Sequence, residues 1–309
     1  MMNQISTLTF SQKIKDELVD QVQVDRTAVM WELWAALVSS AGFGGGKIRI
    51  STGHKGFAHK LKDMIKGIYG AGTRFSKGKD RYTLSLEDTE IVLNIMEDLR
   101  EKLAFNHIGG TISLKNIDNP DYRRSFLKGV FEAIGSMGDP LKSYHLELTT
   151  RRQSVCDFIH RLLREEELGF GYMVRSNYHV LYMKEGRQIS DFLLIIGAHN
   201  AMLQLESLMV DKSVRNLVNR TVNCDNANID RITQTGMRQQ ALLTELKDSR
   251  GLEFLPLDLK QAALHRIKNP EMSIKELGEI MDPPIGKSGM SHRLRKLEAI
   301  AKQELEKLK

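Results

Sequence analysis

The stretch LKGVFEAIG, residues 127–135, decides the fold that we predict for this chain. It closes a helix predicted for residues 121–135, in which apolar residues recur at helical spacing. Gly129 and Ala133 are four residues apart, so both lie on one face of that helix. A face of small residues predicts close packing against a second helix.

An internal repeat supplies the second helix. Residues 25–42 form an apolar-periodic helix that ends in WAALVSSAG, and aligning Gly42 with Gly135 pairs Ala36 with Gly129 and Ser40 with Ala133. The same order of elements then follows in both halves. In the first half we predict a strand at 47–51, a helix at 55–69, a strand pair around 74 and at 81–86, and a helix at 88–103. In the second half we predict a strand at 143–149, a helix at 152–168, a strand pair at 172–176 and 178–184, and a helix at 187–196. Corresponding elements are 93 to 99 residues apart. The sequence therefore predicts a duplicated α+β domain.

LKGVFEAIG also has the spacing of the LAGLIDADG helix, so the chain resembles the LAGLIDADG family of DNA-cutting nucleases. In that family an acid just before the last glycine of each repeat holds the divalent ions that activate water. Ala41 and Ile134 occupy these places here, and neither offers the oxygen ligand that a hard cation needs. Glu132 lies about 200° around the helix from Ile134, and Asp139 follows in the next turn, so neither is an obvious replacement. We expect no catalytic residue, no metal site and no cofactor.

Composition and charge limit the class of protein. The 309 residues predict two or three domains, and 45 Lys and Arg against 39 acids give a charge of +6, which suits a polyanionic partner but is also common in other cytosolic proteins. Cys156 and Cys224 match no zinc or redox spacing. The N-terminal residues lack a signal-peptide pattern, and no apolar run is long enough to cross a bilayer. We expect a cytoplasmic protein, associated with the nucleoid and not with a membrane.

Basic residues gather in the first half of the repeat. Residues 47–81 contain ten Lys or Arg against two acids, whereas residues 142–184 contain seven against five. Such a cluster predicts phosphate contacts, and Lys55, Lys62 and Lys66 are the candidates. A solvated face without a ligand fits the same pattern.

The stretch RNLVNRTVNCDNAN, residues 215–228, lies within a helical linker predicted for residues 198–250. Asn216, Asn219, Arg220 and Asn223 share one helical face. Such side chains can contact bases and phosphates, which makes Arg220 a further candidate phosphate contact. They can equally cap and bond neighbouring segments at a domain junction.

The last fifty residues predict a helix-turn-helix. A helix at 257–267 is stopped by Asn269 and Pro270, and Ser273 with Glu276 forms a capping box that opens the next helix. Residues 282–284, DPP, end this second helix, and a third begins between residues 285 and 288. The last helix of such a motif enters the major groove of DNA.

The two sides of the third helix differ in character. At helical spacing Met290, Leu294, Leu297 and Ala301 share one face, which we expect to pack on the core. Residues 287–296 carry four positive charges and no acid, a pattern that favours DNA contact because a solvated face usually mixes signs. Ser288, His292 and Arg295 lie opposite the apolar face, and Lys287, Ser291, Arg293 and Lys296 flank them.

Four segments together resemble the WhiA family of bacterial DNA-binding proteins: IKELGEIMDPPIGKSGMSHRLRKLEAIA (274–301), RNLVNRTVNCDNAN (215–228), LLIIGAHNAMLQLES (193–207) and TFSQKIKDEL (9–18). The resemblance covers nearly the whole chain. It implies a LAGLIDADG-type domain that has lost its catalytic acids, joined by a helical linker to a helix-turn-helix similar to the promoter-reading domain of sigma factors. It also implies DNA contact by the residues of the matching motif, which are Lys287, Ser288, Ser291, His292, Arg293, Arg295 and Lys296.

The expected organisation is an N-terminal helical segment at 1–24, the duplicated LAGLIDADG-like domain at 25–197, the linker at 198–250 and an all-α helix-turn-helix domain at 251–309. The expected function is non-catalytic, sequence-specific binding of double-stranded DNA. The resemblance to the WhiA family further implies a role in transcription regulation during cell division, or sporulation in some relatives. From the same resemblance we expect RNA polymerase, a sigma factor or another regulator as the protein partner. Two alternatives stay open: a metal-dependent endonuclease with acids from other positions, and a nucleoid- or division-associated protein with little sequence specificity.

Overall fold

The computed structural model describes residues 8–105, 117 and 119–307. The chain divides into two compact units, Met1–Lys212 and Ser213–Lys309. A 52-residue helix, α8 (His199–Arg250), begins in the first unit and continues into the second.

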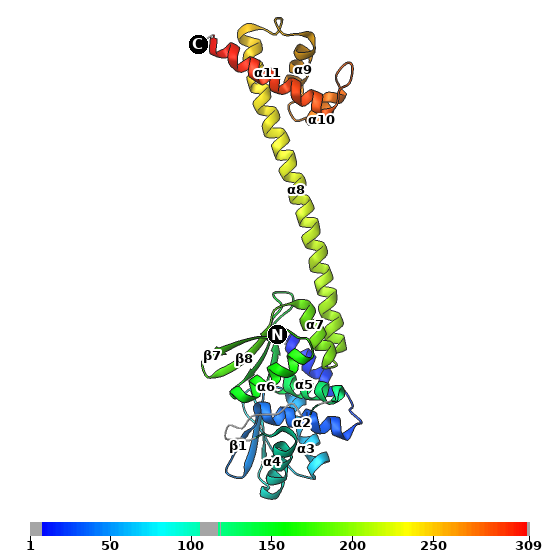
Figure 1. Ribbon diagram of the computed structural model, residues 1–309, viewed down its shortest axis with the longest axis vertical. Helices are drawn as coiled ribbons and strands as arrows, with labels where there is room; N and C mark the ends of the chain where they lie inside the picture. Colours follow the sequence, from blue (N-terminus) through cyan, green and yellow to red (C-terminus); the bar gives the residue numbers. More distant parts are fainter. Residues whose placement is uncertain (1–7, 106–116, 118, 308–309) are drawn as a thin grey trace, which may run out of the picture. The chain divides into compact units, whose positions relative to one another are not determined.

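The first unit contains two αββαββα repeats (Figure 1). The first consists of α2 (Arg26–Ser40), β1 (Gly42–Gly44), β2 (Lys47–Thr52), α3 (Lys55–Tyr69), β3 (Arg74–Lys77), β4 (Tyr82–Leu86) and α4 (Thr89–Leu103). The second consists of α5 (Pro120–Ile134), β5 (Gly135–Met137), β6 (Leu146–Thr150), α6 (Gln153–Glu165), β7 (Gly171–Arg175), β8 (Tyr178–Met183) and α7 (Gly186–Ile195). The strand orders are β1-β2-β4-β3 and β5-β6-β8-β7, with antiparallel neighbours. The predicted duplication is confirmed.

Helices α2 and α5 form the centre of this unit and pack closely against each other (Figure 1). A Cβ atom on Gly129 would lie 2.2 Å from the carbonyl oxygen of Glu32 and 3.1 Å from the Cβ atom of Ala35. No side chain fits at such a distance, so the glycine permits the contact between the two backbones. The predicted close approach through small residues is therefore observed.

Two short strands at the ends of the central helices were missed in the sequence. Strand β1 follows α2 and pairs Gly42 with Arg49 of β2, and strand β5 follows α5 and pairs Gly135 with Leu148 of β6. Each strand has three residues, which is too short for an alternating pattern, and glycine is a weak strand former.

Helix α1 (Phe10–Asp20) packs onto the duplicated core. A capping box between Thr9 and Gln12 opens it, and its residues Phe10, Ile14 and Leu18 are buried. The Glu17 carboxylate accepts hydrogen bonds from the backbone N–H groups of Asn200 (2.7 Å) and Ala201 (3.0 Å), which are unpaired donors in the first turn of α8. The segments TFSQKIKDEL and IGAHNA, distant in sequence, thus meet at the start of α8.

The second unit consists of the C-terminal part of α8 with α9 (Leu257–Lys268), α10 (Ile274–Glu279) and α11 (Lys287–Lys307). Its apolar core contains side chains from all four helices, including Leu243 of α8, Leu259 of α9, Leu277 of α10 and Leu294 of α11. The predicted capping box is present, because the Ser273 hydroxyl accepts from the Glu276 N–H (3.3 Å) and the Glu276 carboxylate from the Ser273 N–H (2.7 Å). Helix α11 starts within the predicted interval.

Candidate nucleic-acid interface

The apolar face of α11 fixes which side of this helix is exposed. Met290, Leu294, Leu297 and Ala301 are all buried, as predicted. They belong to the core that also contains Leu246 of α8. The opposite, basic side of the helix is thereby directed to solvent.

A buried arginine fixes the loop between α9 and α10. The Arg266 side chain is 1% exposed, and its Nη1 atom donates to the carbonyl oxygens of Met272 (2.8 Å) and Pro270 (3.2 Å). Hydrogen bonds from a charged donor are stronger than neutral ones, so this loop is firmly held. The three helices therefore keep a defined arrangement in which α11 is presented.

The turn between α10 and α11 is equally tight. The Ile285 N–H donates to the Gly278 carbonyl (2.9 Å). A Cβ atom on Gly278 would lie 2.4 Å from the Ile285 carbonyl oxygen, so this position requires glycine.

Most predicted DNA-binding residues lie together on the exposed side of α11. Lys287, Ser288, His292, Arg295 and Lys296 are exposed, and Ser291 is half-buried. The Arg295 Nη2 atom donates to the Ser291 hydroxyl (3.1 Å), which holds its guanidinium on this side of the helix.

Arg293 differs from the other candidates. Its Nε atom lies 3.5 Å from the Asp258 carboxylate of α9, and only 25% of its side chain is exposed. This arginine therefore faces the neighbouring helix and is the least available of the seven for a ligand.

The structure divides the basic cluster of residues 47–81 between two surfaces. Lys55, Lys62 and Lys66 share one face of α3; Lys55 and Lys66 are exposed and Lys62 is half-buried. On β2 the alternation of exposed and buried residues places Arg49 on the open face of the sheet, where strand pairing aligns it with Ser85 and Arg74. Arg220, the fourth candidate phosphate contact, is exposed near the middle of α8.

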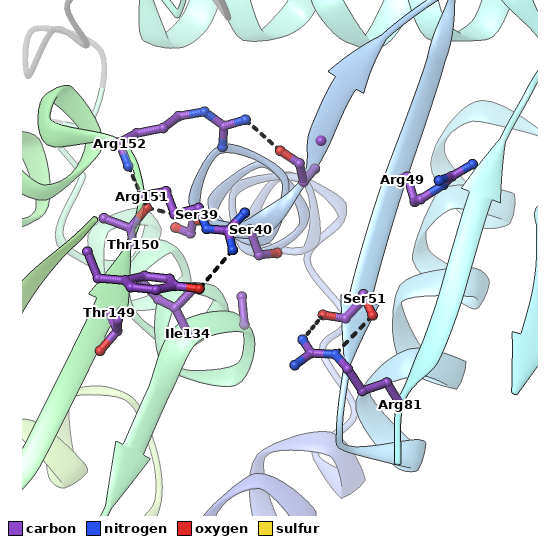
Figure 2. A pocket seen from close by; sticks show the side chains of 14 residues that line it. Ser39, Ser40, Arg49, Ser51, Arg81, Ile134, Thr149, Thr150, Arg151 and Arg152 are labelled. Carbon is purple, nitrogen blue, oxygen red and sulfur yellow. Dashed lines mark hydrogen bonds between the residues drawn. The ribbon is translucent and has the colours of Figure 1, made fainter. Parts of the chain in front are cut away.

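A pocket of about 600 Å³ lies at the ends of α2 and α5, where the LAGLIDADG nucleases hold their metal ions (Figure 2). Ala41 and Ile134 line it, so the places of the two acids do face this pocket. Four arginines also line it, namely Arg49, Arg81, Arg151 and Arg152. No lining residue is an acid. In the described part of the chain, no group of three or more His, Cys, Asp or Glu residues is placed to hold a metal ion.

The sequence gives only indirect indications that these arginines line a pocket. Arg49 occupies an outward position in the alternating strand KIRIS, and Arg151 with Arg152 follows a strand directly. They come from different repeats, so their proximity was not evident in the sequence.

One of the four arginines caps the end of α2. The Arg152 Nη2 atom donates to the Ala41 carbonyl (2.6 Å), and its Nη1 atom donates to the Val38 carbonyl (3.1 Å). Burial lowers the pKa of Arg152. A cation at a helix C-terminus interacts favourably with the helix dipole and satisfies unpaired carbonyls.

Comparison with known proteins identifies both units. Residues 123–215 match the family model "WhiA LAGLIDADG-like domain", and residues 218–301 match "WhiA C-terminal HTH domain". The chain is 36% identical over 315 residues to the "Probable cell division protein WhiA" of Thermoanaerobacter sp. (strain X514), covering 96% of this chain and 98% of that protein. This chain belongs to the WhiA family.

Further relatives agree with this assignment. The WhiA protein of Clostridium novyi (strain NT), also described as a probable cell division protein, is 33% identical over 314 residues, covering 96% of this chain and 98% of that protein. The crystal structure of full-length DUF199/WhiA from Thermatoga maritima superposes with a TM-score of 0.61 at 26% identity, covering 96% of this chain and 99% of that one.

The WhiA assignment confirms the predicted fold class. The chain is an α+β protein with two LAGLIDADG-like halves followed by a helix-turn-helix domain, and that domain implies DNA binding. Among the helices that the structure describes, none combines the length and apolar character needed to cross a membrane.

Proposed function

We propose that this WhiA-family chain binds double-stranded DNA in a sequence-specific manner through α11, and regulates transcription connected with cell division. The observation that carries the proposal is the exposed side of α11, where Lys287, Arg295 and Lys296 supply three positive charges and no acid occurs among residues 287–296. This side lies opposite a buried apolar stripe. In a helix-turn-helix the N-terminal residues of the last helix contact base edges. Ser288, His292 and Arg295 occupy these positions here.

The candidate DNA-binding residues differ in whether their side chains suit phosphates or bases. Lys287 and Lys296 are suited to phosphates, because an ammonium is a flexible point charge. Arg295 can form paired hydrogen bonds to guanine, and the Ser291 hydroxyl already orients its guanidinium. The name of the Thermoanaerobacter relative, a probable cell division protein, supports a role in that process.

A selection experiment tests sequence specificity. Full-length protein would select duplexes from a random pool, and a labelled selected duplex would then compete with unlabelled random DNA. We expect random DNA to bind about a thousandfold more weakly or worse at physiological salt, as for other specific DNA-binding proteins. Equal competition by random DNA would overturn the proposal and favour a nucleoid-associated protein with little sequence specificity.

We further propose that the chain does not cut DNA, because Ala41 and Ile134 stand where the nucleases have their metal-binding acids. Arginines line the same pocket and would repel a divalent cation. Supercoiled plasmid incubated with the protein and magnesium or manganese should stay intact. Nicking that disappears in Glu132→Gln or Asp139→Asn variants would contradict this.

A further inference from the structure

We propose that the pocket at the ends of α2 and α5 is a binding site for phosphate groups, independent of the DNA-binding function proposed for α11. The two repeats each contribute a pair of arginines. In Figure 2, Arg151 and Arg152 lie on one side of the pocket, and Arg49 and Arg81 lie on the other. The pocket is therefore built for a ligand that lies between the repeats.

The charge of the pocket favours an anion. Four guanidinium groups line it without any neutralising acid among the lining residues. Like charges around one cavity repel one another, and a bound anion relieves this repulsion. Guanidinium groups match the geometry of phosphate oxygens with paired N–H donors, so a phosphate is the anion that fits these residues.

Two of the four arginines are bound to the protein itself. Arg152 donates to carbonyls at the end of α2. Arg81 donates through Nε to the Ser51 hydroxyl (3.1 Å) and through Nη2 to the Ser51 carbonyl (2.8 Å). These two supply fixed positive charge and shape the walls of the pocket.

The other two arginines can reach a ligand. Arg49 is exposed and makes no hydrogen bond from its side chain to any described residue. Arg151 is exposed as well, and one of its nitrogens donates to the Tyr178 hydroxyl (2.9 Å), while the ring of Tyr178 lies 5.1 Å from the guanidinium carbon. The remaining N–H groups of Arg151 are oriented by these contacts and can bind phosphate oxygens.

The pocket also offers hydroxyl groups and sufficient volume. Ser40, Ser51 and Tyr178 line it beside the arginines. Its volume of about 600 Å³ is in the range of small-ligand sites. A phosphate group here can belong to the DNA backbone or to a free phosphorylated molecule such as a nucleotide, and the chemistry of recognition is the same.

The test compares two charge-matched double variants of the full-length protein. Arg49→Gln with Arg151→Gln removes the two available arginines and leaves the buried contacts of Arg152 intact. Arg100→Gln with Arg164→Gln removes two exposed arginines of α4 and α6 that do not line the pocket. Calorimetric titration with inorganic pyrophosphate measures binding of a free phosphorylated probe, and the salt dependence of affinity for a short random duplex measures binding to DNA phosphates.

If the site takes a free phosphorylated ligand, native protein and control variant should bind pyrophosphate, and the pocket variant should bind about tenfold more weakly or worse. If it takes a DNA phosphate, the pocket variant alone should show a salt slope smaller by about 0.9 for each phosphate that it no longer binds. The proposal is overturned if native protein does not bind pyrophosphate and all three proteins share one salt slope. It is also overturned if the control variant is weakened as much as the pocket variant.

Discussion

The ammonium nitrogen of Lys60 lies 2.7 Å from a carboxylate oxygen of Glu132 in the interior of the first unit. Lys60 also pairs with Glu32 of α2, and the Lys128 ammonium lies 3.7 Å from that same carboxylate. Each of the two central helices thus contributes one buried acid, and both acids pair with one lysine of α3. Burial, and then the neighbouring Glu32 carboxylate, raise the pKa of Glu132 from 4.5 to about 8.

This pKa predicts that the stabilisation contributed by Glu132 is lost between about pH 4.5 and 8. The folded state retains a proton on Glu132 that the unfolded chain releases, so the stabilisation is complete below the unfolded pKa and lost as pH rises through the folded one. The slope is limited to about 1.4 kcal/mol per pH unit for one proton. Urea unfolding across this range should show a flatter pH profile for Glu132→Gln than for native protein. The exposed Glu97→Gln on α4 is the control, and an identical slope in all three proteins would contradict the assignment to Glu132.

The contact between the two central helices predicts a second effect on stability. Gly129→Ala should destabilise the first unit by about 1 to 3 kcal/mol or more, because the added methyl overlaps the Glu32 carbonyl and the helices must separate. Gly67→Ala is the matched control, because a Cβ atom there meets nothing within 4 Å in a helix of the same unit. It should stabilise the protein by roughly 0.5 to 1 kcal/mol. Thermal or urea unfolding of both variants measures the difference, and equal effects would contradict a glycine-dependent helix contact.

Periodicity explains why much of the fold was predictable. The stripe of Met290, Leu294 and Leu297 identifies the buried side of α11 from spacing alone, because a regular helix converts sequence positions into angles. The order of the repeats was readable for the same reason, since the long helices and the alternating strands keep their patterns in both halves.

Contacts between distant residues were not predictable in this way. Spacing identifies Arg49 as an outward residue of its strand, but only the packing of the two repeats brings it to the same pocket as Arg151. Likewise, Glu132 lies on an apolar-rich helix, and its partner Lys60 comes from another element. The hydrogen bond from the Asn200 N–H to Glu17 joins residues far apart in the sequence, so no local sequence pattern predicts it.

The lysines of α3 give a prediction about phosphate binding in the first unit. If this face binds the DNA backbone, the triple variant Lys55→Ala, Lys62→Ala, Lys66→Ala should weaken binding to every duplex alike, and the salt slope should fall by about 0.9 for each phosphate released. Fluorescence anisotropy over a range of salt concentrations measures this. A control variant replaces three exposed lysines of this unit that lie outside α3, Lys13, Lys142 and Lys184, and it should keep the native slope. An unchanged slope in the α3 variant would identify this face as ordinary solvated surface.

The exposed side of α11 gives the sharpest prediction, because two arginines of the same helix differ in surroundings. The double variant His292→Ala, Arg295→Ala leaves the buried stripe of Met290 and Leu294 intact, and alanine favours helix, so the thermal melt should persist. Removing a side chain that reads a base should cost roughly 1 to 3 kcal/mol of discrimination, and the preferred sequence should loosen at one or two positions. Arg293→Ala is the comparison, because this arginine faces Asp258 and should affect specificity much less. If the double variant keeps both its melting temperature and its full affinity for the selected duplex, another surface reads the sequence. If its affinity for every duplex falls by the same factor, the two side chains contact phosphates and not bases.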